Sequence, residues 1–150
     1  VGSEMCIRDR GKTLWDAMIE MYEQFGYYKD AIQSVTMKGI EGLQKIQEIM
    51  NSLRQNPPAE FAGHKVTAVR DYKADTITDV ATGAVKPTGL PNSNVLYYEL
   101  TDDAWVCVRP SGTEPKVKFY YGIKGTSLEE ADAKSESLGK EVLAMIEKML

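Results

Sequence analysis

The spacing of apolar residues changes along the chain between the helical and the strand period, and it predicts an order of elements. Two segments repeat apolar residues at intervals of three and four, the period of an amphipathic helix. The first stripe is predicted to be a plain core face rather than a cofactor groove. The first consists of Ile40, Leu43, Ile46, Met50 and Leu53 and is ended by Asn56-Pro57-Pro58; the second consists of Leu138, Val142, Met145, Ile146 and Met149.

Capping signals fix where two helices begin. Ser127 is followed three residues later by Glu130, the pattern of a capping box, so the last helix is predicted to start there. Thr13 and Asp16 give a similar start to a shorter helix, which is predicted to reach about residue 25, before Gly26.

Strand patterns occupy the segment before the first long helix and most of the segment between the two long helices. Residues 95–101 and 104–109 are predicted to form an antiparallel hairpin around Asp102-Asp103. The other strand predictions are 31–37, 65–72, an interrupted strand over 74–85 and 116–121, with a loop at 86–94. The order strand, helix, several antiparallel strands, helix predicts an α+β fold with two main helices on one face of an antiparallel sheet.

The segment between the last two predicted strands, Arg109 to Lys116, has the composition of a phosphate cradle. Arg109 supplies a planar fork of donors, and Ser111 and Thr113 supply hydroxyl groups. Gly112 lacks the Cβ that would keep an anion away from backbone N–H groups. The prolines at both ends of the turn restrict it to a preformed shape.

The strand that follows concentrates positive charge near this turn. Lys116, Lys118 and Tyr120 share one face, while Val117, Phe119 and Tyr121 share the other and are predicted to face the core. Both ammonium groups are then expected near the opening of the loop. The formal charge of residues 109–125 is +3, in a chain whose net charge is −4. The alternative interpretation is an ordinary hairpin turn with solvated lysines.

The full string Arg-Pro-Ser-Gly-Thr-Glu-Pro, followed by a basic residue in a strand, resembles the C-terminal phosphate-binding loop of the α-D-phosphohexomutases, the phosphoglucomutase and phosphomannomutase family. Residues 30–150 resemble the whole final domain of such an enzyme, which implies a TATA-binding-protein-like fold. Residues 11–29 resemble the end of the domain before it. By motif match, the residues that would grip a substrate phosphate are Arg109, Ser111, Gly112, Thr113 and Lys118.

The resemblance also implies a reaction. Family members interconvert sugar 1-phosphates and 6-phosphates through a sugar 1,6-bisphosphate, using a phosphoserine and Mg²⁺. The phosphoserine, metal and sugar loops of the family (Thr-Ala-Ser-His-Asn-Pro, Asp-x-Asp-x-Asp-Arg and Gly-Glu-Glu-Ser) do not occur in this sequence. The chain is therefore expected to be a fragment that holds no catalytic or metal-binding residue, works with missing upstream domains and is inactive alone. Glucose is the favoured sugar, because the sequences of the loop and of the Phe25-Gly26-Tyr27-Tyr28 segment most resemble those of bacterial phosphoglucomutases.

Composition narrows the remaining classes of function. The chain is 43% hydrophobic and 27% charged, and no apolar run approaches the ~20 residues of a membrane span. We therefore expect a soluble cytoplasmic domain without a membrane partner. An acidic balance, with a pI near 5.1, argues against a nucleic-acid partner. Residues 1–10 show no apolar period and are expected to be a foreign or disordered tail.

Three further sets of residues are expected to have structural or solvent-facing roles rather than roles in catalysis or metal binding. Cys6 and Cys107 are too few for a disulfide framework, and Cys107 is expected to be a buried structural thiol. His64 has no nearby nucleophile and is not expected to be a catalytic base. Asp71, Asp75 and Asp79 are expected to be solvated rather than metal ligands. Two other functions stay open: a stand-alone module that binds phosphate or sugar phosphates, and nucleic-acid binding on a basic, aromatic sheet face.

Overall fold

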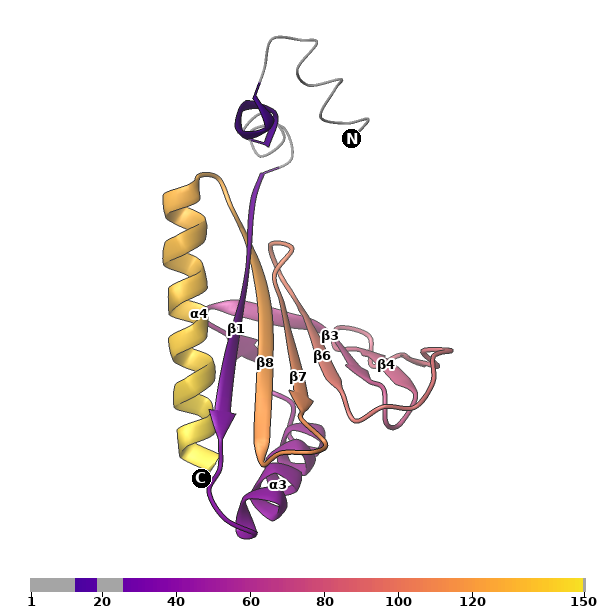
Figure 1. Ribbon diagram of the computed structural model, residues 1–150. Coiled ribbons are helices and arrows are strands. Elements are labelled where there is room, and N and C mark those ends of the chain that lie inside the picture. Colours follow the sequence, from indigo (N-terminus) through magenta and orange to yellow (C-terminus); the bar gives the residue numbers. More distant parts are fainter. Residues whose placement is uncertain (1–12, 19–25, 150) are drawn as a thin grey trace.

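The computed structural model of the chain describes residues 13–18 and 26–149. In these residues, one antiparallel sheet is accompanied by two long helices (Figure 1). The predicted α+β class is confirmed. The strands are β1 (Tyr27–Thr36), β2 (Glu60–Phe61), β3 (His64–Asp71), β4 (Thr76–Asp79), β5 (Val85–Lys86), β6 (Leu96–Leu100), β7 (Trp105–Pro110) and β8 (Lys116–Gly125), and the helices are α3 (Glu41–Gln55) and α4 (Leu128–Met149).

In the sheet, the first strand, β1, pairs with the last strand, β8. Its strand order is β1-β8-β7-β6-β3-β4-β5, and β2 pairs with β3. β1 lies antiparallel to β8 over ten positions, from Tyr27 opposite Gly125 to Thr36 opposite Lys116. α4 follows β8 and runs beside β1 and β8 in Figure 1. The first strand is therefore held in place by the last strand and the last helix.

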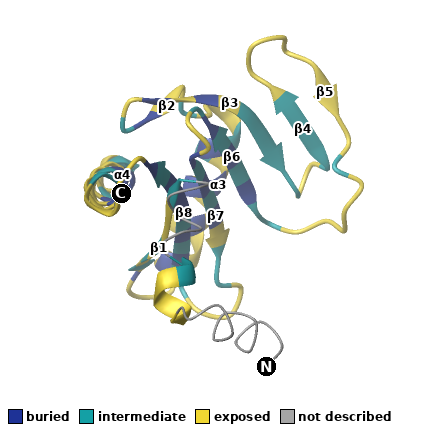
Figure 2. Cartoon of the chain, turned by 90° about the horizontal axis from the view of Figure 1, so that it is seen from above, coloured by how far each residue is buried: buried dark blue, intermediate teal, exposed yellow. Residues whose placement is uncertain are grey.

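The core lies between the sheet and the helices. In β8, Val117, Phe119 and Tyr121 are buried, as the alternating pattern predicts. They share one core cluster with Ile46 and Leu53 of α3 and with buried residues of α4. The outer side of α4 stays exposed (Figure 2). Both helices thus supply side chains to the same hydrophobic core.

The opposite, open face of the sheet carries half-buried polar and aromatic side chains. Trp105 packs as predicted: its ring stacks on Tyr97, with centroids 5.7 Å apart and planes 8° from parallel. A Cβ on Gly122 would come within 2.3 Å of Trp105 Nε1, so the glycine makes room for the indole. Cys107 lies on this face and is only partly buried, which corrects the expectation of a buried thiol. Its partial burial still raises the pKa of the thiol.

The apolar stripe of α3 is rotated from its predicted place. Ile40 is 93% exposed and Leu43 is 51% exposed, whereas Ile49, which the prediction left out, is buried. The helix begins at Glu41, so Ile40 precedes its first turn. Gly42 faces inward instead, because a Cβ there would lie 2.8 Å from Met37 Cβ and 3.1 Å from Pro115 Cβ. The start of α3 therefore packs closely on the segment before β8.

The predicted caps and the predicted hairpin are confirmed. Thr13 and Asp16 exchange a hydrogen bond from Asp16 N to Thr13 Oγ1 (3.1 Å) and one from Thr13 N to Asp16 Oδ2 (3.1 Å). Between β6 and β7, Asp102 and Asp103 both have positive φ, 61° and 57°, as a two-residue hairpin turn with the right-handed twist of its strands requires.

Several boundaries differ from the prediction. β1 begins at Tyr27 rather than at residue 31, β8 continues to Gly125, and the short β2 was missed. The missed residues pair across the sheet, which supplies hydrogen bonds that alternation within one segment does not reveal. Residues 1–10, and residues 19–25 of the predicted helix at 13–25, lie outside the described residues. The division between residues 11–29 and 30–150 stays a prediction.

Candidate phosphate-binding site

A cavity of about 430 Å³ opens at the turn between β7 and β8. The structure brings all five predicted site residues together around it. Pro110 and Tyr120 complete the lining. Tyr120 was missed as a site residue, although its position on the same strand face as Lys118 was the signal that could have found it. The lining also includes Arg109, Ser111, Gly112, Thr113 and Lys118.

The loop is shaped by its own backbone. Ser111 N donates to Lys116 O over 2.8 Å, and Lys116 N donates to Glu114 O over 2.7 Å. Gly112 has a φ of +54°, in the left-handed region that glycine adopts without a Cβ penalty. No atom lies within 4 Å of the place where its Cβ would be, so the space over this residue is open. A bound anion can therefore approach the peptide backbone there.

Two cations lie side by side in the lining of this cavity. Arg109 of β7 and Lys118 of β8 occupy directly paired positions of the antiparallel sheet. Like charges at directly opposed positions repel each other. None of the residues that line the cavity is acidic, so no lining carboxylate balances the two charges. The site therefore favours an anion electrostatically, and its donors suit oxygen atoms.

Lys116 does not join this cavity, which corrects the expectation that both ammonium groups lie at the loop opening. Its Nζ lies 3.4 Å from Glu114 Oε2. The side chain of Lys116 is 30% exposed, and that of Glu114 is 63% exposed. The acidic residue of the loop thus partners the first lysine of β8, and the second lysine lines the cavity.

The loop is also anchored to the rest of the fold. Met37 N, between β1 and α3, donates to Pro115 O over 2.7 Å. Gly42 of α3 leaves room for the Pro115 ring, as described above. These contacts join the turn to the region between β1 and α3, so the loop is not held by its two strands alone.

The other candidates lie elsewhere. His64 is buried at the start of β3, with its Nδ1 3.4 Å from Asp102 Oδ2 in the β6–β7 turn. Asp71 is not solvated as expected: its side chain is 14% exposed and pairs with Arg54 at 3.1 Å. Asp75 accepts hydrogen bonds from Thr88, which lower the pKa of its carboxyl group.

Asp79 caps a turn with its carboxylate. Its carboxylate accepts hydrogen bonds from the backbone N–H groups of Ala81 and Thr82, and the Thr82 bond is the main cause of its lowered pKa. In the part of the chain that the structure describes, no group of three or more His, Cys, Asp or Glu side chains could hold a metal ion. The described residues therefore offer no set of ligands that fits Mg²⁺.

The sequence matches a known family over much of this fold. Residues 49–136 match the family described as phosphoglucomutase/phosphomannomutase, C-terminal domain. The chain belongs to this family. The matched range contains the whole loop and every residue proposed to bind phosphate. The α-D-phosphohexomutase resemblance read from the loop is thereby confirmed.

Relatives of this phosphohexomutase domain include two phosphoglucomutases of Staphylococcus aureus. That of strain bovine RF122 / ET3-1 is 37% identical over 128 residues, and that of strain MRSA252 is 36% identical over 128 residues. Each alignment covers 85% of this chain and 23% of the relative. The chain therefore spans less than a quarter of the length of these relatives.

A solved structure shows the same fold at low sequence identity. The exocytosis-sensitive phosphoprotein pp63/parafusin from Paramecium, a phosphoglucomutase in an open form, matches with a TM-score of 0.53 and 14% identity. The match covers 91% of this chain and 22% of that protein.

Among the described helices, none has the length and apolar character needed to cross a membrane.

Proposed function

We propose that this chain is the phosphate-gripping part of a phosphohexomutase that interconverts a sugar 1-phosphate and a sugar 6-phosphate. In this proposal, Arg109, Ser111, Gly112, Thr113 and Lys118 hold the phosphate that is not reacting. The observation that carries it is the pair of opposed cations, Arg109 and Lys118, on a cavity lined by no carboxylate. Family membership supports the same class of ligand.

The role of such a grip is placement. Phosphoryl transfer depends mainly on positioning and on charge stabilisation. Arg109 and Lys118 hold one phosphate of the substrate, while the hydroxyls of Ser111 and Thr113 donate to its oxygens. The distance from this phosphate to the other end of the sugar then sets where the reacting group lies. The phosphoserine and Mg²⁺ are assigned to the missing upstream domains, together with the choice of sugar, for which we favour glucose.

The size of the effect follows from the bonds involved. A charge-assisted hydrogen bond contributes about 1.5 to 3 kcal/mol. Arg109→Ala in the complete enzyme is therefore expected to reduce kcat/KM by about ten- to a hundredfold. Steady-state kinetics with glucose 1-phosphate measure this. Unchanged kinetics in that variant would remove Arg109 from the proposed role.

The 150-residue chain itself allows a direct binding test. An NMR titration with inorganic phosphate and with glucose 1,6-bisphosphate should give saturable shifts at the amides of Ser111, Gly112 and Thr113. We expect no mutase activity from the same sample, because the proposed phosphate donor lies in the missing domains. Absence of saturable shifts at tens of millimolar ligand would contradict a grip that this domain forms alone.

Two lysines of β8 supply a matched control. Lys118→Ala removes a cation that lines the cavity, whereas Lys116→Ala removes the same charge from a side chain paired with Glu114. We expect Lys118→Ala to weaken phosphate binding by about tenfold and Lys116→Ala to change it by less than about twofold. Equal losses in the two variants would show that only net charge matters. Lys118→Ala is also made in the complete mutase. If the complete variant loses activity while the isolated Lys118→Ala chain binds phosphate normally, the grip lies elsewhere.

A further inference from the structure

A buried ion pair lies where α3 ends, outside the cavity described above. Arg54 Nε donates to Asp71 Oδ2 over 3.1 Å, and the two side chains are only 15% and 14% exposed. Desolvation of two charges largely offsets their attraction, so a buried pair adds little net stability, and specifying one geometry is a better-supported role. Asp71 Oδ1 also accepts a hydrogen bond from Lys73 N over 3.0 Å, which fixes the carboxylate.

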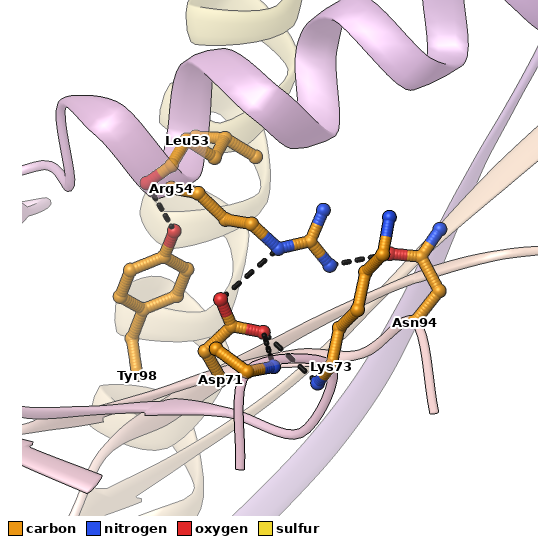
Figure 3. A network of polar contacts seen from close by, with 7 residues as sticks. Leu53, Arg54, Asp71, Lys73, Asn94 and Tyr98 are labelled. Atoms are coloured by element: carbon orange, nitrogen blue, oxygen red, sulfur yellow. Dashed lines mark hydrogen bonds and ion pairs between the residues drawn. The ribbon is translucent and has the colours of Figure 1, made fainter. Parts of the chain in front are cut away.

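The same guanidinium reaches the loop before β6. Arg54 Nη2 donates to Asn94 Oδ1, so one planar group joins the end of α3, the end of β3 and this loop (Figure 3). The backbone adds two bonds, from Tyr72 N to Val95 O (3.1 Å) and from Ser93 N to Tyr72 O (3.2 Å). The chain is therefore held on two sides immediately before β6 begins.

This loop lies next to the residue that presents the guanidinium of the cradle. Leu96 pairs with Val108 in the β6–β7 register, so the next position outward places Val95 beside Arg109. A second cavity, of about 270 Å³, is lined by Asn94 and Val95 together with Arg109 and Gly112. It shares Arg109, Pro110 and Gly112 with the cavity of about 430 Å³. Asn94 and Val95, which these bonds fix, therefore border the phosphate loop directly.

We propose that Arg54 is a positioning residue for the phosphate loop. Its bonds to Asp71 and Asn94 fix the entry of β6, and that entry supports the end of β7 from which Arg109 extends. The proposal rests on the proposed function, because it names a residue that acts through the same site. It requires arginine in particular, since a lysine ammonium lacks the planar fork that donates in two fixed directions.

The test uses a charge-neutral double variant, Arg54→Met/Asp71→Asn. Removing both partners avoids leaving one buried charge uncompensated, which would unfold the chain for an unrelated reason. Arg70→Met/Glu99→Gln is the matched control: it removes another ion pair with one partner on β3, on the open face, with side chains 37% and 36% exposed. Neither residue of that pair lines either cavity at the phosphate loop.

Phosphate affinity and the urea midpoint are measured for each variant. We expect Arg54→Met/Asp71→Asn to bind phosphate about five- to tenfold more weakly while remaining folded, and the control to bind within about twofold of the wild type. Arg54→Lys should also bind more weakly, because it cannot replace both bonds. Wild-type affinity in the folded Arg54→Met/Asp71→Asn variant would overturn the proposal.

A ligand-free measurement separates this proposal from the phosphate grip itself. Amide shifts of the Arg54→Met/Asp71→Asn variant should spread from Asn94 through Val95 to Arg109, Ser111 and Gly112. Shifts that stop at Asn94 would overturn the positioning role, whether or not the wild-type chain binds phosphate. If the wild type binds no phosphate but the shifts reach Gly112, the grip fails as a function of this chain and the coupling through Arg54 stands.

Discussion

The aromatic stack on the open face depends on a missing side chain. Trp105 lies parallel to Tyr97, and its indole occupies the space that a Cβ on Gly122 would need. Such a Cβ would also come within 2.6 Å of Asp30 Oδ1 on β1. Gly122 on β8 therefore leaves room on the open face for side chains of the two neighbouring strands, β1 and β7. The same strand, β8, carries Lys118.

Gly122→Ala should destabilise the fold and disturb the stack. Overpacking by one methyl group costs about 1 to 3 kcal/mol when the neighbours are bulky. Urea unfolding measures the loss, and near-UV circular dichroism reports the displaced indole. Ser34→Ala, at an exposed position of β1, should leave both measurements unchanged. An intact stability and spectrum in Gly122→Ala would show that the indole moves at no cost.

At the scale of elements, α4 begins with a cap formed by the two residues before it, Thr126 and Ser127, and by Glu130 in its first turn. Glu130 N donates to Ser127 Oγ over 3.1 Å, and Thr126 N donates to Glu130 Oε2 over 3.0 Å. Hydrogen bonds from Lys134, and then from Thr126, lower the pKa of Glu130 to about 2. The cap fixes the angle at which α4 leaves β8, and with it the helix that covers β1 and β8.

The hydrogen bonds of Glu130, to Lys134 first and then to Thr126, predict a pH dependence of stability. The folded pKa of Glu130 lies below its ordinary value of 4.5, so its stabilising effect is present above about pH 4.5 and disappears as the pH falls toward about 2. Glu130→Gln should flatten the stability profile in that window, whereas Glu147→Gln, with the same charge change near the end of α4, should not. Unfolding midpoints measured from pH 2 to pH 6 test this. An unaltered slope in Glu130→Gln would contradict the assignment.

Removing the hydroxyl of the same cap gives an independent check. Ser127→Ala should lower the free energy of unfolding by about 1 kcal/mol at neutral pH, because the N–H group of Glu130 loses its acceptor. Ser137→Ala, at an exposed position inside α4, is the matched substitution and should be close to neutral. Equal effects in the two serine variants would mean that helix propensity, rather than capping, sets the difference.

At the scale of the whole molecule, the first described strand, β1, completes one edge of the sheet and covers part of the core. β1 pairs with β8 at ten positions, and Ala31 and Val35 pack against the core cluster. All members of that cluster and its packed neighbours lie between residues 31 and 149. A chain that begins at Tyr27 should therefore retain a cooperative unfolding transition, and one that begins at Met37 should lose it.

Thermal unfolding followed by circular dichroism compares the two truncated chains with the complete one. Loss of β1 exposes the backbone N–H and C=O groups of β8 and uncovers part of the surface under α4. The shorter chain is thus expected to aggregate. A chain from Met37 that unfolds at the wild-type midpoint would show that β8 and α4 hold the fold without the first strand.

The local elements were predictable because their signals lie within a few residues of one another. Ser127 and Glu130 marked the start of α4, Asp102-Asp103 marked a hairpin, and the alternation of Val117, Phe119 and Tyr121 marked the buried face of β8. The same holds for the loop: Arg109 to Thr113 are contiguous, so their common cavity follows once the turn forms. Period, capping and turn chemistry are properties of short segments.

The amino-acid sequence by itself determined the α+β class, the family and the composition of the loop from Arg109 to Lys116. Only the tertiary structure decided which residues meet across distant segments: Asp71 is buried against Arg54, 17 positions away, and Arg54 also donates to Asn94, 40 positions away. The physical reason is distance along the chain. Residues 17 or more positions apart meet only through sheet register and helix packing, and no periodicity within one segment encodes that meeting.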